Sequence, residues 1–339
     1  MAGFVNASST ETPESVAAAL KVAGLFGFRQ VAALSQFESF GNENWLVEIR
    51  EDRRIVLRRY LHANRERIAF QIRLRRRLHA LGFPVAEVLT TTTGGGFHVD
   101  EQDVAWAAFE HVEGREFNFS TEDAIKASRR LAEFHLLGAG WGDAAPPLLH
   151  RPSIRDCWAN SEADVAGLRE LFAGAAVDDE LAYLEAWWRV VRQEWPLERL
   201  DALPHGLVHG DFHGRNLAYT DEGLVGIFDF DDVEHGPLVH DLAGSTYKFG
   251  RESRFSPPLR PDVVNAFLAA YSAVRPLTAE ERAALPVMMA MSYPPNPRYY
   301  CYYRDHHGTN IVNRLRREVG VMRMLRADVV RVFPARLLA

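Results

Sequence analysis

Residues 207–241 contain three polar side chains whose types and spacing could support phosphoryl transfer. Asp211 and Asn216 stand five positions apart in the glycine-containing stretch HGDFHGRN, and Asp229 follows thirteen positions later. Two short apolar runs between Asn216 and Asp229 flank the turn TDEG, a pattern that predicts a β-hairpin. Because a hairpin brings its ends together, we expect Asn216 and Asp229 to lie side by side, with Asp211 nearby.

Phosphoryl transfer from ATP requires this combination of side chains. One carboxylate orients the attacking hydroxyl and accepts its proton, while a second carboxylate and an amide oxygen hold Mg²⁺. Since Mg²⁺ prefers oxygen ligands and keeps several waters, two protein ligands and the phosphates suffice. We therefore expect ATP and Mg²⁺ as cofactors.

Three histidines at four-residue spacing, His205, His209 and His213, offer an alternative metal site. This spacing places ligands on one face only in a helix, and the glycines of the stretch make a helix unfavourable. A loop of ordinary turn residues would explain residues 213–215, but not the three polar residues at their fixed spacings. We therefore favour phosphoryl transfer over a zinc site.

The stretch resembles the catalytic loop and metal-binding aspartate of the aminoglycoside phosphotransferase and choline kinase superfamily. Its HGDxHxxN form, followed by DFDD, is most similar to the branch that contains type II homoserine kinases and the bacterial stress-response Ser/Thr kinase. The resemblance implies that Asp211 is the catalytic base and that Asn216 and Asp229 bind the metal. His209 would support the loop, and Asp241 would brace it from the start of a helix.

The resemblance covers nearly the whole chain and implies an α+β, two-lobe, protein-kinase-like fold. A small, mostly β N-terminal lobe would clamp the nucleotide, and a larger, mostly helical C-terminal lobe would hold the catalytic loop and the acceptor. The expected boundaries are residues 1–109, a hinge at 110–115, and residues 116–339.

Hydrophobic periodicity agrees with this division. In the first lobe we expect helices at 13–24 and 64–80, and strands from residue 31 on both sides of a loop at 39–44, then at 54–60, 85–89, 97–99 and 104–111. In the second lobe we expect helices capped at Ser120 or Thr121 and at Asp178 or Asp179, followed by helices near 262–272, 278–291 and 311–333.

By resemblance, the nucleotide would contact two further segments of the first lobe. The loop at 39–44 would lie over the phosphates, and its candidate contacts are Ser39, Gly41 and Asn42. Backbone groups of the hinge residues Glu110 and Val112 would meet the adenine.

Arg58 occupies the position where kinases usually carry a strand lysine that contacts the α- and β-phosphates. An arginine can make this contact with different reach and geometry. In the family the cation pairs with a helix glutamate, and the aligned residue here is Gln71, with Glu66 as the nearest acid. Arg58 and Arg59 could instead be exposed charges of a strand.

Two features could define the acceptor site. Asp231 and Asp232 could attract an ammonium group, or could shape the loop and assist Mg²⁺. By resemblance, C-terminal helices wall the acceptor pocket, and the stretch SYPPNPRYYCYYRDHH there contains Tyr299, Tyr303 and Arg304. Tyrosine faces could hold a quaternary amine or a sugar, and arginines could bind a carboxylate. The tyrosines could equally fill the lobe core.

The composition limits the partners and the compartment. The 339 residues carry a formal net charge of -6, which does not indicate nucleic-acid binding. Only two cysteines occur, which suggests a reducing compartment. With no secretory signal pattern and no membrane-length apolar run, we expect a cytoplasmic protein without a membrane partner.

The expected function is ATP- and Mg²⁺-dependent phosphorylation of a hydroxyl on a small molecule, with an amino sugar, aminoglycoside or amino alcohol as first choice. The first alternative is a bacterial Ser/Thr protein kinase of the stress-response type. The second is a nucleotide-binding module with little activity, because Arg58 and Gln71 replace the usual Lys and Glu pair. The residues determine neither the acceptor nor the oligomeric state.

Overall fold

The computed structural model describes residues 12–37, 42–50, 53–61, 64–253, 258–292 and 294–332. The chain divides into two compact units. The first comprises Met1–Phe117 and Gly214–Asp231, and the second comprises Asn118–His213 and Asp232–Ala339. The predicted lobes divide the chain once, near residues 110–115, whereas the first unit also includes the later segment that contains the hairpin.

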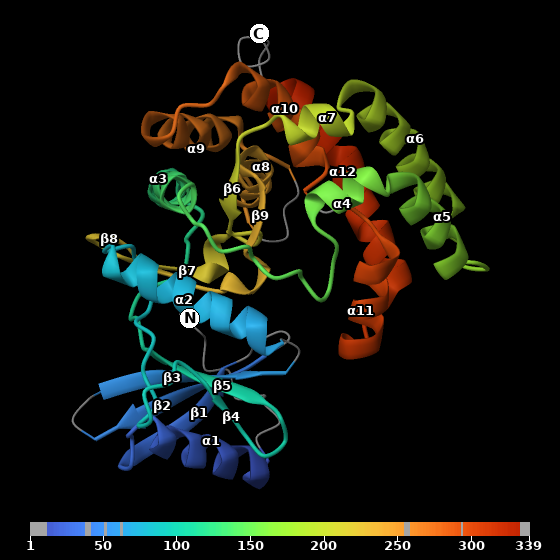
Figure 1. Cartoon of the computed structure of the whole chain (residues 1–339). Helices are drawn as coiled ribbons and strands as arrows, with labels where there is room; N and C mark the ends of the chain where they lie inside the picture. The colour runs from blue at the N-terminus through green and yellow to red at the C-terminus, as the bar shows by residue number, and fades with distance from the viewer. Residues whose placement is uncertain are drawn as a thin grey trace. The chain divides into compact units, whose positions relative to one another are not determined.

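The first unit is built on a five-stranded antiparallel sheet in the order β1-β2-β3-β5-β4. Its strands are β1 (Val31–Phe37), β2 (Glu43–Ile49), β3 (Arg53–Tyr60), β4 (His98–Val99) and β5 (Ala105–Glu110). Helices α1 (Pro13–Leu25) and α2 (Arg65–Ala80) lie on opposite faces of this sheet (Figure 1). Successive side chains of β5 therefore pack alternately: Trp106 is buried against α1, and Ala107 against α2.

Local signals account for the two helices of this unit. Thr12 caps α1 and Pro13 occupies its first turn, while Asn64 caps α2. Both predicted helices are confirmed. The predicted strand at 85–89 is wrong. Val85 forms an isolated bridge with Ile227, and Val88 forms one with Phe109. Because these two residues pair with different segments, the stretch forms no continuous strand.

The predicted hairpin is confirmed as β7 (Leu217–Thr220) and β8 (Gly223–Ile227). Backbone hydrogen bonds tie it to the rest of the first unit. The Ile227 N–H donates to the Pro84 carbonyl at 2.7 Å, and Arg115 and Tyr219 exchange two bonds of 2.8 and 2.9 Å. These bonds explain why the hairpin belongs to the sheet-based unit although it lies a hundred residues further along the chain.

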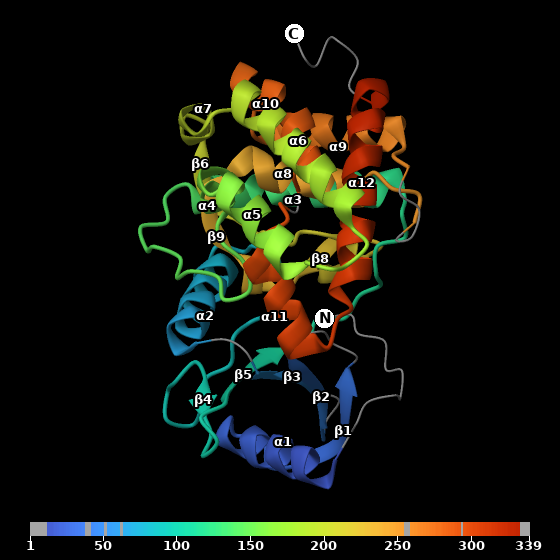
Figure 2. The ribbon, with the colours of Figure 1, turned by 90° about the vertical axis from the view of Figure 1, so that its right-hand side faces the viewer.

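The second unit is mainly helical. It contains α3 (Thr121–Gly138), α4 (Ile154–Ala159), α5 (Ser161–Leu171), α6 (Asp178–Glu194), α7 (Leu197–Asp201), α8 (Leu238–Phe249), α9 (Pro261–Val274), α10 (Ala279–Ala290), α11 (Pro297–His307) and α12 (Ile311–Val332), with a two-stranded sheet of β6 (His205–Val208) and β9 (Glu234–Pro237). Helix α3 packs on α9, α8 packs on α10, and the long helix α12 runs beside α6 (Figure 2).

Some helix starts in this unit follow from the sequence. Ser120 caps α3, as predicted, and Thr278 forms a capping box at α10. The predicted cap of α6 is wrong: Val177 holds the cap position, and Asp178 lies inside the first turn, where its charge complements the helix dipole. Among the described residues, none of the helices has an apolar stretch of the length that a bilayer requires.

Candidate active site

The loop that carries Asp211 begins at the end of β6. Its second residue, Gly210, has φ +78°, a left-handed conformation that side chains rarely adopt. A Cβ added there would also clash with the carbonyl oxygen of Asp232 and lie 2.9 Å from its Cβ. A glycine is therefore required immediately before Asp211.

Asp241, in the first turn of α8, holds the same loop through its backbone. Its carboxylate accepts hydrogen bonds from the N–H groups of His209 and Gly210, at 2.7 and 3.1 Å. A ring nitrogen of the buried His135 lies 3.1 Å from the same carboxylate. Burial alone would raise the pKa of Asp241, but His135, His209 and the backbone donor lower it to about 2.

The side chain of Asp211 lies between two nitrogen-bearing side chains. The Lys248 ammonium donates to Oδ1 at 2.8 Å, and His213 Nε2 lies 3.2 Å from Oδ2. Burial alone would raise the pKa of Asp211, but Lys248 and His213 outweigh it and hold the pKa well below its usual range. Asp211 is therefore ionised at neutral pH, as a proton acceptor must be.

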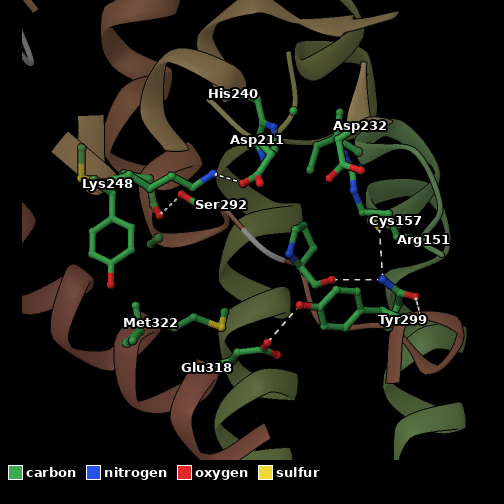
Figure 3. Close-up of a pocket in the computed structure, with 18 of the residues that line it drawn as sticks. Arg151, Cys157, Asp211, Asp232, His240, Lys248, Ser292, Tyr299, Glu318 and Met322 are labelled. Carbon is green, nitrogen blue, oxygen red and sulfur yellow. Dashed lines mark hydrogen bonds and ion pairs between the residues drawn. The ribbon is translucent and has the colours of Figure 1, made fainter. Parts of the chain in front are cut away.

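A cavity of about 550 Å³ in the second unit opens onto Asp211. Figure 3 shows Asp211, Asp232, Lys248 and Tyr299 around it. Of the predicted acceptor residues, Asp232, Tyr299 and Tyr303 line this cavity. Arg304 does not line it, and pairs instead with the adjacent Asp305 at 2.7 Å.

Asp232 gives this cavity a second carboxylate. His150 Nε2 lies 3.3 Å from its Oδ1, and the neighbouring Arg151 pairs with Glu234 at 2.7 Å. Burial alone would raise the pKa of Asp232, but His150 and Arg151 lower it to about 2. The cavity therefore presents two anionic side chains, Asp211 and Asp232, at neutral pH.

In the first unit, the hairpin brings Asn216 and Asp229 together. Asn216 ends the short 3₁₀ turn η1 (Gly214–Asn216), and the Phe228 N–H donates to the Asn216 carbonyl at 2.9 Å. Asp229 follows directly, with φ +60°. The hairpin therefore brings together an amide oxygen and a carboxylate, a hard-oxygen donor set that fits Mg²⁺.

The carboxylates near the hairpin end hold Arg58. Its side chain is only 5% exposed, its guanidinium lies 3.2 Å from Asp229, and it also pairs with Asp231. Burial alone would lower the pKa of Arg58, but Asp231 and Asp229 outweigh it and raise that pKa. The interpretation of Arg58 as an exposed strand charge is therefore wrong.

The predicted pairing of Arg58 with Gln71 or Glu66 is also wrong. Gln71 is buried, and its Oε1 accepts no hydrogen bond from the described part of the chain. Glu66 lies on the exposed side of α2. The physical reason is electrostatic: an ionised carboxylate binds a buried guanidinium more strongly than a neutral amide does, and the hairpin supplies two.

Asp231 belongs to the first unit rather than to the cavity. Its carboxylate accepts from Arg58 and, at 2.7 Å, from Asn42 Nδ2, and its carbonyl accepts from Arg67. Asn42 Oδ1 in turn accepts from the Leu61 N–H at 3.1 Å. These bonds place Asn42 beside the carboxylates that hold Arg58.

Of the remaining predicted nucleotide contacts, the structure describes Glu110 and Val112. Ser39 and Gly41 lie outside the described residues. Glu110 ends β5 and pairs with Arg53, and Val112 packs against the cluster that covers the α2 face of the sheet.

Lys248 was not among the site residues predicted from the sequence. The available signal was its position seven residues after Asp241, because residues at this spacing lie on the same helix face. The alternative zinc site finds no support: among the described residues, no group of three or more His, Cys, Asp or Glu side chains could hold a metal ion.

The model of the phosphotransferase enzyme family matches residues 33–284. A homoserine kinase of Mesorhizobium japonicum is 32% identical over 163 residues, which are 48% of this chain and 47% of that protein. An uncharacterized protein of Deinococcus radiodurans is 30% identical over 299 residues, which are 84% of this chain and 82% of that protein. Among solved structures, a microcompartment-associated aminopropanol kinase has a TM-score of 0.69 at 18% identity. The superposition covers 96% of this chain and 99% of the kinase chain.

The structural similarity confirms the predicted kinase-like α+β fold. The chain belongs to the phosphotransferase enzyme family, so the resemblance found in the sequence is confirmed as well. The chain spans about half the length of several homoserine kinases that it resembles.

Proposed function

We propose that the protein catalyses ATP- and Mg²⁺-dependent phosphorylation of a hydroxyl group on a small, amine-bearing molecule. The observation that carries this proposal is the ionised Asp211 at the wall of a cavity of about 550 Å³. A cavity of this size suits a small-molecule ligand. The membership of the phosphotransferase enzyme family supports the reaction class.

Each proposed role follows from the chemistry of the side chain. Asp211 orients the acceptor hydroxyl and accepts its proton as the hydroxyl oxygen attacks the γ-phosphorus. Asn216 and Asp229 hold Mg²⁺, which neutralises charge on the phosphates when bound. Arg58 steadies the phosphates, with Asn42, Ser39 and Gly41 as further contacts and the backbone at Glu110 and Val112 as the adenine contact. His209 and Asp241 support the catalytic loop.

The amine of the acceptor would bind near Asp232. Its carboxylate lines the cavity and stays ionised, and Tyr299 and Tyr303 present aromatic rings to the same space. The names of the similar proteins, an aminopropanol kinase and a homoserine kinase, both describe amine-bearing alcohols as acceptors. Amino alcohols, amino sugars and aminoglycosides are therefore the first compounds to test.

One observation favours a hydroxylated amino acid within this class. Arg317 lines the cavity, and its guanidinium makes no ion pair with any residue in the described part of the chain. An acceptor that carries a carboxylate as well as an amine would satisfy both Arg317 and Asp232. A matched pair of acceptors, homoserine and its decarboxylated analogue 3-amino-1-propanol, separates the two possibilities.

The experiment measures ADP release from Mg-ATP with pooled amino alcohols, amino sugars, aminoglycosides and hydroxylated amino acids, and with a generic protein substrate. Turnover with one small-molecule pool supports the proposal and names the acceptor class. Turnover with the protein pool, or stoichiometric self-labelling, would replace it by the protein-kinase alternative. Bound ATP without turnover in any pool would favour the module with little activity. We also place the protein in the cytoplasm, consistent with its two free cysteines.

A further inference from the structure

Helix α8 contacts the catalytic loop twice from one of its faces. Asp241 and Lys248 are seven residues apart, so they lie on the same face about two helical turns apart. Asp241 accepts from the backbone N–H groups of His209 and Gly210, while Lys248 donates to the side chain of Asp211. One rigid element therefore fixes both the main chain and the side chain of the proposed base.

Lys248 is an unusual lysine in this protein. Lys21, Lys126 and Lys248 are the only lysines of the sequence. The side chains of Lys21 and Lys126 are 69% and 25% exposed and pair with surface glutamates, whereas that of Lys248 is 7% exposed. Burying an ammonium group is costly unless a carboxylate compensates it, and here the compensating carboxylate is Asp211.

We propose that Lys248 is a positioning residue for phosphoryl transfer, which holds the Asp211 carboxylate by its Oδ1 so that the acceptor hydroxyl meets it in one orientation. This inference rests on the function proposed above. The geometry that carries it is the 2.8 Å contact between Lys248 Nζ and Asp211 Oδ1 at the wall of the cavity (Figure 3).

The proposed step balances without a proton from Lys248. The acceptor O–H bond breaks and its proton moves to Asp211, while the hydroxyl oxygen forms a bond to the γ-phosphorus. The bond from that phosphorus to the oxygen bridging to the β-phosphate breaks, and ADP takes the electron pair. Lys248 stays protonated throughout, and its charge keeps Asp211 ionised until the acceptor arrives.

The groups that face Asp211 come from several elements of the second unit. Lys248 belongs to α8, His213 belongs to the loop itself, Asp232 lines the same cavity, and Tyr303 belongs to α11. Lys248 provides the charge-assisted contact from outside the loop. Its removal would leave Asp211 near Asp232, a like charge that favours the protonated form of each carboxyl group.

The test compares Lys248→Met with Lys248→Arg, using an acceptor identified in the pooled assay. Lys21→Met is the control, because it removes an exposed lysine from a surface ion pair. For Lys248→Met we expect kcat to fall about 100-fold, the lower end of the contribution of a positioned general base, with the KM for ATP changed less than threefold. The kcat of Lys248→Arg should be at least tenfold higher than that of Lys248→Met, and the kcat of Lys21→Met should match that of the wild type.

The pH dependence of kcat/KM supplies a readout that a structural role would not change. In Lys248→Met the acidic limb should move to higher pH, because Asp211 loses the cation that favours its ionised form. Lys248→Arg should return the limb towards its wild-type position. An unmoved limb in Lys248→Met, or a loss of activity that appears only as a raised KM for ATP, would overturn the inference.

A labelling experiment covers the case in which Lys248→Met does not fold. Competitive reductive methylation of folded protein, followed by mass spectrometry, should modify Lys248 several times faster in Asp211→Asn than in the wild type, with Lys21 unchanged. Equal Lys248 labelling would overturn the inference. A wild type that shows no turnover with any pool refutes the proposed function, and the inference with it. Turnover that persists undiminished in Lys248→Met refutes the inference alone.

Discussion

The guanidinium of Arg58 and the carboxylate of Asp229 lie 3.2 Å apart within the first unit. Arg58 comes from β3 and Asp229 follows β8, so two segments separated by more than 150 residues meet at one ion pair. Both side chains are proposed to act on the nucleotide, one through the phosphates and the other through Mg²⁺. Because the Arg58 guanidinium is buried and depends on these carboxylates, a change at Asp229 should alter the position of Arg58.

Arg58→Met should lower kcat/KM for ATP about 100-fold. The substitution removes charge-assisted hydrogen bonds worth about 1.5–3 kcal/mol each, and tenfold in rate corresponds to about 1.4 kcal/mol. Arg58→Lys should recover part of the loss, since it keeps the charge but not the planar fork. Steady-state kinetics at varied ATP measures this effect. Arg59→Met, a change in the adjacent arginine, should stay within threefold of the wild type, and an equal effect of both changes would contradict the assignment.

Asn216→Ala and Asp229→Asn should each raise the Mg²⁺ concentration needed for half-maximal activity by about tenfold or more. Each change removes one of the two protein oxygens proposed to bind the ion, and Mg²⁺ uses few protein ligands. Titration of activity with Mg²⁺ at fixed ATP measures the shift, and EDTA should abolish wild-type activity reversibly. Activity that persists in EDTA would exclude the proposed metal role of both residues.

Gly210→Ala should destabilise the protein by about 2 kcal/mol or more, because the residue has a left-handed φ and the added Cβ would clash with Asp232. Activity should fall with it, since Asp211 follows directly. Urea unfolding followed by tryptophan fluorescence measures the change. Gly140→Ala is the matched control, as a Cβ there meets nothing within 4 Å. The same unfolding midpoint for Gly210→Ala and the wild type would contradict the reported loop geometry.

Asp241 should make stability depend on pH. Its pKa is about 2 in the folded protein, below the usual value of 3.8, so its contribution is complete above about pH 4 and is lost as pH falls through about 2. The difference corresponds to roughly 2–3 kcal/mol at neutral pH. Asp241→Asn should therefore be less stable than the wild type at pH 7, and the difference between their free energies of unfolding should become smaller below pH 4. Free energies of unfolding measured from pH 7 to pH 2.5 test this pH dependence. A difference between the two proteins that stays constant over this range would contradict it.

The parts of the site that are close in sequence could be predicted. The hairpin between Asn216 and Asp229 follows from two short apolar runs and a turn, and both residues lie where that pattern puts them. The helix at 64–80 and the helix capped at Ser120 or Thr121 follow from caps and periodicity, and the structure has them at Arg65–Ala80 and Thr121–Gly138.

The partners that are distant in sequence could not be predicted. The family resemblance suggested that Gln71 would hold Arg58. In the structure the carboxylates of Asp229 and Asp231, which are more than 150 residues away in sequence, bind it instead. Asp231 and Asp232 are adjacent in sequence, yet the turn η2 (Phe230–Asp232) directs them to different units, where one pairs with Arg58 and the other lines the cavity. A one-residue difference of this kind depends on backbone geometry that composition and spacing do not specify.

Phosphoryl transfer to a small-molecule hydroxyl is tested most directly by identifying the phosphorylated product. The wild type and Asp211→Asn would be incubated with Mg-ATP carrying ¹⁸O in the γ-phosphoryl group and with the acceptor found in the pooled assay, and the products would be analysed by mass spectrometry and ³¹P NMR. We predict a phosphate monoester on the acceptor hydroxyl that retains the label, formed by the wild type and at least 100-fold more slowly by Asp211→Asn. Label found only in inorganic phosphate would exclude transfer to the acceptor, and an equal rate in the variant would exclude Asp211 as the base.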